Sequence, residues 1–93
     1  MALRFSWDAR KAAANARKHR VTFTEATTVF DDPLSVTIPD PDHSLGEQRF
    51  LLLGMSNRGG LLVVAHAERD DTIRIITTYH HRQAGRPPRE TEI

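Results

Sequence analysis

Three apolar runs of strand length dominate the second half of the chain. They cover residues 49–55, 61–67 and 73–79, and the segments between them contain the Gly, Asn and Asp residues typical of turns. Turns this short cannot hold a crossover helix, so the pattern predicts three consecutive antiparallel strands. The run 61–67 is apolar at both odd and even positions. It is therefore expected to be a middle strand with both faces covered.

The segment before these strands predicts a helix over residues 9–19. Asp8 is placed as its N-cap, and the apolar positions within it are all small. Ala9, Ala12, Ala13 and Ala16 have helical spacing and predict a narrow face that can approach a sheet closely. The opposite side is basic and is expected to face solvent or a ligand.

A second, shorter helix is predicted to begin at Thr22. The spacing of Thr22 and Glu25 is that of a capping box, in which the hydroxyl accepts from the amide of Glu25 and the carboxylate reaches back to the amide of Thr22. The helix should end in the segment 31–33, since its proline disfavours helical geometry at the residue before it. Residues 34–38 alternate and predict a first strand, which a loop over 39–46 follows. Two prolines near the C-terminus predict an irregular tail over 80–93.

These elements predict an α+β fold in which two N-terminal helices pack on a four-stranded antiparallel sheet. A length of 93 residues favours one domain over 1–93. The absence of cysteine excludes disulfides, thiolate metal sites and a nucleophilic thiol, which fits a cytoplasmic protein. No visible signal segment and no apolar run of transmembrane length occur, so we expect no membrane association.

The charged residues are sorted along the chain, although the net charge is only +1. Residues 1–20 contain six basic side chains and one acid, and residues 21–48 contain six acids without Lys or Arg. From residue 49 onward the chain has seven arginines, no lysine and five acids. Such sorting can build a positive surface on a nearly neutral molecule.

Several spaced motifs, in the same order along the chain, resemble the BrnT family of toxins. They extend over roughly residues 5–78 and are Trp7-Asp8-x-x-Lys11-Ala12, Asn15-x-x-Lys18-His19, Val21-x-Phe23-x-Glu25-Ala26, Val29-Phe30-x-Asp32-Pro33, Asp42-x-x-x-x-Glu47-x-Arg49-Phe50 and Ile73-Arg74-Ile75-Ile76. The resemblance implies a RelE-like fold and the toxin of a type II toxin–antitoxin operon. Such a toxin cleaves RNA, inhibits translation and arrests growth. The resemblance also implies a BrnA-type antitoxin, a complex of two toxins with two antitoxins, and contact with operator DNA only through the antitoxin.

The chain departs from the family pattern at three positions. Arg20 stands where the family usually has the glycine that suits a left-handed helix cap, and Gln48 replaces a second acid. Tyr79 stands where the family offers an arginine, and it is followed by His80 and His81. Either these histidines substitute for the arginine, or this toxin is weakened or inactive.

RNA cleavage without a metal needs a base for the 2′-hydroxyl proton, cations for the charge on the phosphoryl oxygens and an acid for the leaving 5′ oxygen. His19 can be base or acid, since imidazole titrates near neutral pH. Glu47 is the natural base if a neighbouring arginine keeps it ionised. The catalytic candidates are Lys18, His19, Glu47, Arg49 and Arg74, and they must converge in one groove. Further RNA contacts are expected from Lys11, Asn15, Arg17 and His80, with no cofactor.

Each candidate also has a purely structural alternative. His19 could bond the last carbonyls of its helix, Glu47 and Arg49 could form an edge ion pair, and Arg74 could pair with an acid across strands. His66 is expected to be a half-buried structural side chain. Adjacent histidines face opposite ways in a strand, so residues 80 and 81 do not predict a metal site.

Two other functions remain open from the sequence. The first is a module that binds RNA or the antitoxin without turnover. The second is a structural co-repressor whose acidic segment, residues 25–47, contacts its partner.

Overall fold

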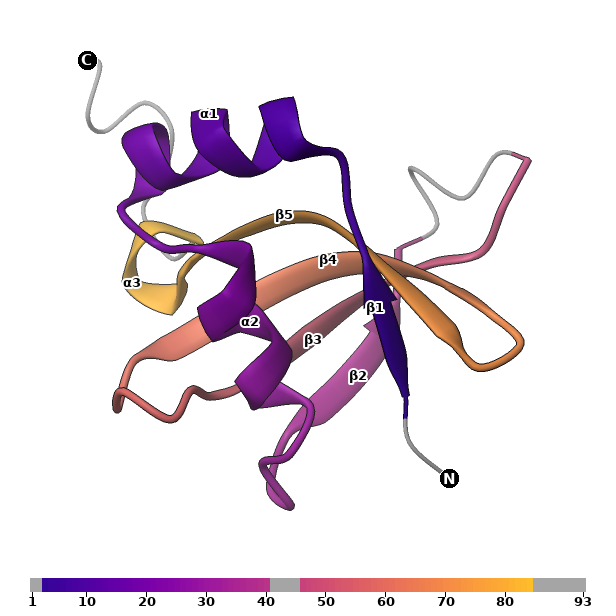
Figure 1. Ribbon diagram of the computed structural model, residues 1–93. Helices are drawn as coiled ribbons and strands as arrows, with labels where there is room; N and C mark the ends of the chain where they lie inside the picture. Colours follow the sequence, from indigo (N-terminus) through magenta and orange to yellow (C-terminus); the bar gives the residue numbers. More distant parts are fainter. Residues whose placement is uncertain (1–2, 41–45, 85–93) are drawn as a thin grey trace, which may run out of the picture.

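The computed structural model describes residues 3–40 and 46–84, and Figure 1 shows its helices packed on one sheet. The elements are β1 (Arg4–Ser6), α1 (Ala9–His19), α2 (Phe23–Val29), β2 (Val36–Pro39), β3 (Arg49–Met55), β4 (Leu61–Arg69), β5 (Thr72–His80) and α3 (His81–Ala84). The strands form one sheet in the order β1-β5-β4-β3-β2. The meander of β3, β4 and β5 is antiparallel, as its short turns required.

The prediction of four antiparallel strands was wrong in number and in direction. The sheet has five strands and is mixed, because β1 pairs with β5 in parallel. Phe5, the central residue of this short strand, pairs with Ile73 and places its ring 5.2 Å from the ring of Phe30. A strand of three residues has too little alternation to be recognised in the sequence. The first strand predicted, over 34–38, is observed as β2.

The predicted tail was also wrong at its beginning. β5 continues to His80, and the short helix α3 follows directly. Residues 85–93, and residues 41–45 of the predicted loop, lie outside the described part of the chain.

Helix α1 begins as predicted but buries a different face. Asp8 Oδ1 accepts from the amides of Arg10 and Lys11 at 2.8 and 3.1 Å. Ala12 packs against the core, whereas Ala9 and Ala13 are exposed, and the only residue of α1 that is fully buried is Asn15. The predicted alanine face is therefore right for Ala12 and Ala16, which are partly buried, and wrong for Ala9 and Ala13, since the helix also turns a polar side chain toward the sheet.

The turn after α1 is made at Arg20 in the left-handed conformation. Arg20 has φ 60° and donates its amide to the carbonyl of Ala16, so it fills the role of the missing glycine. For a residue with a Cβ this conformation costs roughly 1–2 kcal/mol.

The start of α2 matches half of the predicted capping box. The Thr22 hydroxyl accepts from the amide of Glu25 at 3.0 Å. The Glu25 carboxylate instead accepts from the hydroxyl of buried Ser56 at 2.6 Å, which fastens the turn between β3 and β4 to the helix. Phe23, Ala26 and Val29 of α2 are all buried.

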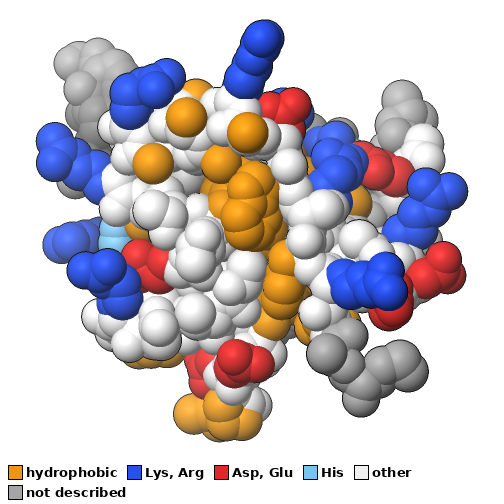
Figure 2. Space-filling model, in the orientation of Figure 1, with side chains coloured by type: hydrophobic (Ala, Val, Ile, Leu, Met, Phe, Trp, Pro, Cys, Tyr) orange, Lys and Arg blue, Asp and Glu red, His pale blue; other side chains and the backbone are white. Residues whose placement is uncertain are grey.

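The core lies between α2 and the sheet. It contains Val21, Phe23, Ala26, Val29, Leu52, Leu62, Val64, Ile73 and Ile75. Helix α1 runs along the β5 side of this arrangement, as Figure 1 shows. Figure 2 views the helix-bearing side, where Lys and Arg side chains surround exposed hydrophobic atoms at the centre. We call the opposite side of the sheet, turned away from α2, the open face.

The open face is defined by the register of the three central strands. Its residues form three rows, which are Arg49–Ala67–Arg74, Leu51–Ala65–Thr77 and Leu53–Val63–Tyr79. A shift of register in the β4–β5 pairing, between Ala65 and His66, leaves Ile76 as an extra residue in β5. Because of this bulge, Arg74 and Tyr79 share the open face although an odd number of positions separates them. β4 is a middle strand as predicted, and Val63 and Ala67 are buried on this face.

Gly54 of β3 provides the close approach between the sheet and the end of α2. A Cβ at Gly54 would lie 2.8 Å from Ser35 Cβ and 2.9 Å from Val29 Cγ1. We expect Gly54→Ala to lower the free energy of unfolding by about 1–3 kcal/mol, because the added methyl group overpacks this contact. Chemical denaturation measures the change.

Gly60→Ala is the matched control, since the nearest atoms to its Cβ would lie at 3.6 Å, an ordinary contact. Equal destabilisation by the two substitutions would show that loss of glycine, and not the close approach, causes the effect.

Candidate active site

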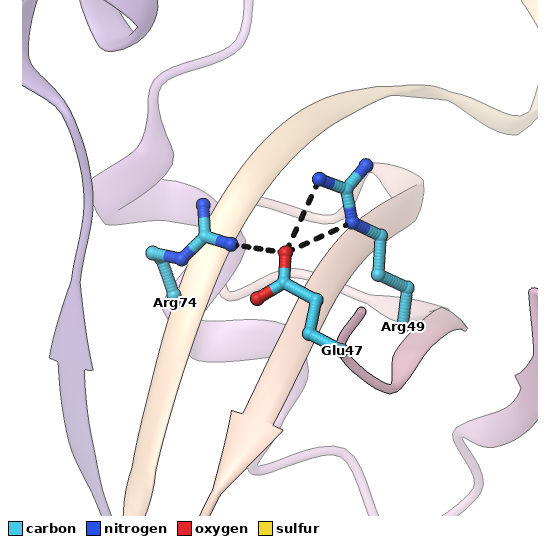
Figure 3. A network of polar contacts seen from close by, with 3 residues as sticks. All are labelled: Glu47, Arg49 and Arg74. Atoms are coloured by element: carbon cyan, nitrogen blue, oxygen red, sulfur yellow. Dashed lines mark hydrogen bonds and ion pairs between the residues drawn. The ribbon is translucent and has the colours of Figure 1, made fainter. Parts of the chain in front are cut away.

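Glu47 joins two arginines across the first row of the open face. Arg49 pairs with Ala67 on β4, and Ala67 pairs with Arg74 on β5, so a small residue separates the two long side chains. Glu47 Oε1 accepts from Arg74 Nη2 at 2.5 Å and from Arg49 Nε at 3.2 Å, as Figure 3 shows. Three of the five catalytic candidates therefore converge.

The two guanidinium groups keep the Glu47 carboxylate ionised. The hydrogen bond from Arg74 is the main cause that lowers the pKa of Glu47 below its usual value of 4.5; partial burial opposes it, and Arg49 adds to the lowering. In the described structure, the carboxylate contacts both arginines through Oε1. Within residues 3–40 and 46–84, Oε2 makes no polar contact.

Two hollows flank this cluster on the open face. The first, about 600 Å³, is lined by Glu47, Arg74, Thr72 and residues of the β4–β5 turn; we call it the Arg74 hollow. The second, about 360 Å³, is lined by Arg49, Leu51, Ala65, Ile76, Thr77, Tyr79 and Asp40; we call it the Tyr79 hollow. Volumes of about 300–1,000 Å³ are usual for ligand pockets.

Lys18 and His19 lie beside the second hollow, not in the ion cluster. Together with Lys11 they line a smaller hollow of about 200 Å³ between α1 and β5, the Lys18 hollow. Its wall includes Ile76 and Thr77, which also line the Tyr79 hollow. The His19 ring lies 5.7 Å from the Tyr79 ring, centroid to centroid. The basic end of α1 and the arginine row thus border neighbouring hollows.

His80 and Arg17 do not join this group. His80 pairs with buried Leu62, and a Cβ on Gly60 would lie 3.6 Å from its Cε1, which places its ring on the side of the sheet that α2 covers. His80 therefore cannot replace an arginine at position 79. Arg17 is exposed on α1 and lines none of these hollows.

Asn15 differs most from its expected role. Its side chain is 7% exposed, and the amide group donates to the carbonyls of Val21 and Thr78 at 3.2 and 2.9 Å. Its Oδ1 accepts from the amide of Thr78 and the hydroxyl of Thr77 at 3.1 and 2.8 Å. These four bonds occupy the polar atoms of Asn15, so it fixes α1 to β5 and is not available to RNA.

His66 is a structural residue, more deeply buried than expected. It is 0% exposed, and its ring nitrogens lie 3.2 Å from the Val64 carbonyl and 3.0 Å from the Glu68 carboxylate.

Among the residues that the structure describes, no three His, Cys, Asp or Glu side chains group to hold a metal ion. In the same residues, no helix is long and apolar enough to cross a membrane.

Sequence reasoning missed the Tyr79 hollow. Tyr79 was considered only as a missing arginine, and in a regular strand its odd spacing from Arg74 would place the two side chains on opposite faces of the sheet. Only the bulge at Ile76 brings them to one face, and no residue type at this position announces it.

Comparison with protein families gives a match over residues 7–84 to the model described as the ribonuclease toxin BrnT of a type II toxin–antitoxin system. The chain belongs to the BrnT toxin family. The fold agrees with the crystal structure of the Brucella abortus ribonuclease toxin BrnT, with a TM-score of 0.66 over 85% of this chain and 96% of that chain. Identity between the two is 16%. No curated protein sequence matches the chain.

The expected resemblance to the BrnT family is thereby confirmed. A family of type II toxins implies an antitoxin partner for this chain. The fold is an α+β arrangement like that of the Brucella toxin, with the five-stranded mixed sheet described above.

The position of Asn15 gives a first test of the site in this BrnT toxin. Asn15→Ala should lower the free energy of unfolding by at least about 1–3 kcal/mol, since buried backbone groups of Val21 and Thr78 lose their partner. Lys11→Ala, on the exposed side of the same helix, should change it by less than about 0.5 kcal/mol. Thermal or denaturant unfolding measures both. A neutral Asn15→Ala would contradict the structural role.

The lowered pKa of Glu47 gives a pH dependence of stability. The ionised carboxylate stabilises the fold fully above the unfolded value near 4.5, and this contribution is lost as pH falls through the lower folded value. Glu47→Gln should therefore lower the melting temperature at pH 7, and the difference from wild type should shrink as pH falls below 4.5.

Asp31→Asn is the control, because it removes an exposed carboxylate that makes no ion pair in the described structure. A difference between wild type and Glu47→Gln that stayed constant from neutral to acidic pH would rule out the ion cluster as its source.

Proposed function

We propose that this chain is a metal-independent endoribonuclease whose reaction takes place at the Glu47–Arg49–Arg74 cluster. The observation that carries the proposal is one carboxylate held by two guanidinium groups on an open sheet face, with a hollow on either side. Guanidinium groups match phosphate oxygens in charge and geometry. A phosphate placed over Ala67, between Arg49 and Arg74, would meet both cations.

The cluster supports attack of a ribose 2′-oxygen on the adjacent phosphorus. Glu47 Oε2 takes the 2′-hydroxyl proton as the new O2′–P bond forms, and the two arginines stabilise the charge on the phosphoryl oxygens. The P–O5′ bond then breaks, which yields a 2′,3′-cyclic phosphate and a 5′-oxygen that needs a proton. A substrate phosphate competes for the arginines with Oε1 and so raises the basicity of Glu47.

The leaving 5′-oxygen would receive its proton from the end of α1. Lys18 and His19 line a hollow that shares Ile76 and Thr77 with the Tyr79 hollow, so a strand lying along the open face passes both. His19 suits proton transfer near neutral pH. Lys11 and Lys18 would hold flanking phosphates.

The cellular setting follows from the family. The partner would be a BrnA-type antitoxin, in a complex of two toxins and two antitoxins that reaches operator DNA through the antitoxin alone. The free toxin would act in the cytoplasm, where RNA cleavage inhibits translation and arrests growth.

A module that binds RNA without turnover is the second candidate. The observation that favours it is the double ion pair itself, since a carboxylate held by two arginines is a weak base. Such a module would bind RNA through phosphate contacts, with affinity that falls steeply as salt rises, and would leave the strand intact.

Cleavage of a labelled RNA by the purified toxin separates these candidates. Endoribonuclease action predicts products with 2′,3′-cyclic phosphate ends, persistence in EDTA and no cleavage when the 2′-hydroxyl at the scissile position is removed. Glu47→Gln should lower the cleavage rate at least about 100-fold, the usual contribution of a general base, while RNA binding persists. Binding by the wild type without any product would establish the second candidate instead.

Growth in cells tests the cations. Induction of Lys18→Ala or Arg49→Ala should relieve the growth arrest that the wild-type toxin causes, while each variant still co-purifies with the antitoxin. Thr24→Ala, an exposed position on α2, is the control and should leave the arrest unchanged. Loss of the antitoxin complex in both variants would reassign these residues to the interface or the scaffold.

A further inference from the structure

The Tyr79 hollow differs in chemistry from the ion cluster beside it. Its wall combines aliphatic side chains, Leu51, Ala65 and Ile76, with the ring of Tyr79. Within the described part of the chain, Arg49 is the only Lys or Arg that lines it, and this residue belongs to both the hollow and the cluster. A ligand part that enters here leaves the arginine row and meets mainly apolar and aromatic surface.

The position of the Tyr79 ring is set by two features of the fold. The bulge at Ile76 brings Tyr79 to the open face, two rows from Arg74, which corresponds to a distance of roughly 13 Å along the strand. The His19 ring contacts it from the end of α1, with an angle of 47° between the ring planes. The ring is therefore held between the sheet and the helix.

The Tyr79 side chain is uncharged. Burial raises the pKa of Tyr79 above its usual range, and the Asp40 carboxylate adds a smaller effect in the same direction. The hydroxyl therefore keeps its proton at neutral pH. A neutral ring in an apolar wall offers stacking surface, and unpaired RNA bases stack on such rings.

We propose that the Tyr79 hollow is a subsite for one unpaired nucleobase of the RNA, with Tyr79 as its stacking platform and Arg49 on the phosphate next to that base. The subsite rests on the proposed function insofar as the ligand is RNA. It adds that the toxin holds its substrate by a base as well as by phosphates. Tyr79 then sets the position of the strand relative to Glu47.

The chain offers a direct probe, since Tyr79 is its single tyrosine. Ring-labelled tyrosine gives one set of NMR signals, and these report on the hollow alone. The ligand is a single-stranded 2′-O-methyl trinucleotide, which cannot be cleaved, and its partner is the same trinucleotide with the central base removed. Both have the same phosphates, so a difference between them comes from the base.

The base-containing trinucleotide should shift the Tyr79 ring signals upfield, and the abasic one should not. Tyr79→Leu should weaken binding of the base-containing ligand about tenfold or more and leave binding of the abasic ligand unchanged, in line with the usual effect of removing one stacked base. Tyr79→Phe keeps the ring and should retain affinity. Met55→Ala, exposed on β3 and outside this hollow, is the control and should also retain it.

Equal shifts and equal affinities for the two ligands would overturn the subsite. So would a Tyr79→Leu variant that binds both ligands normally but loses the antitoxin, since the hollow would then belong to a protein interface. Cleavage of RNA without any base effect would leave the proposed function intact and remove only the subsite. A base-dependent shift without cleavage would keep the subsite and reject the nuclease.

Discussion

The bulge in the β4–β5 pairing is the constraint on which both sides of the sheet depend. Before the bulge, Ile73 and Ile75 point into the core and Arg74 points away from it. Without an extra residue, the alternation would turn Tyr79 toward the core and Thr78 toward the open face. With Ile76 inserted, Thr78 is buried and donates its hydroxyl to the Val63 carbonyl. One irregularity therefore keeps Thr78 in the core and places Arg74, Thr77 and Tyr79 on a single surface.

The shortness of β1 explains why α1 needs a buried asparagine. The part of β5 beyond β1 has backbone groups at Thr78 that no strand on that side satisfies, since β1 pairs only with Thr72–Arg74. Asn15 acts in place of a neighbouring strand, because its amide bonds both the N–H and the C=O of Thr78. A buried backbone group without a partner is costly, so an apolar residue at this position would lose what close packing gains. The position of Lys18 and His19 beside the open face follows from this contact.

Local chemistry explains which parts of the fold were predictable. The N-caps at Asp8 and Thr22, the antiparallel meander and the family itself could be inferred, because each depends on residues close together in sequence or on several motifs in order. Strand β1, the identity of the buried face of α1 and the position of Tyr79 depend on pairing across the sheet. The convergence of Glu47, Arg49 and Arg74 agreed with expectation since a regular register brings them together, whereas His80 and Asn15 were misjudged because the bulge and the helix rotation are tertiary effects.

The ion cluster could serve both stability and chemistry, because the two oxygens of the Glu47 carboxylate have different surroundings. Oε1 of Glu47 accepts from both arginines, which fixes the side chain across Ala67 and keeps it ionised. Oε2 makes no polar contact in the described structure, and no dashed line reaches it in Figure 3. An ion pair that served only to brace an edge would gain from bidentate contacts with both oxygens. The observed geometry instead engages one oxygen only, which supports the role of general base that we propose for Glu47.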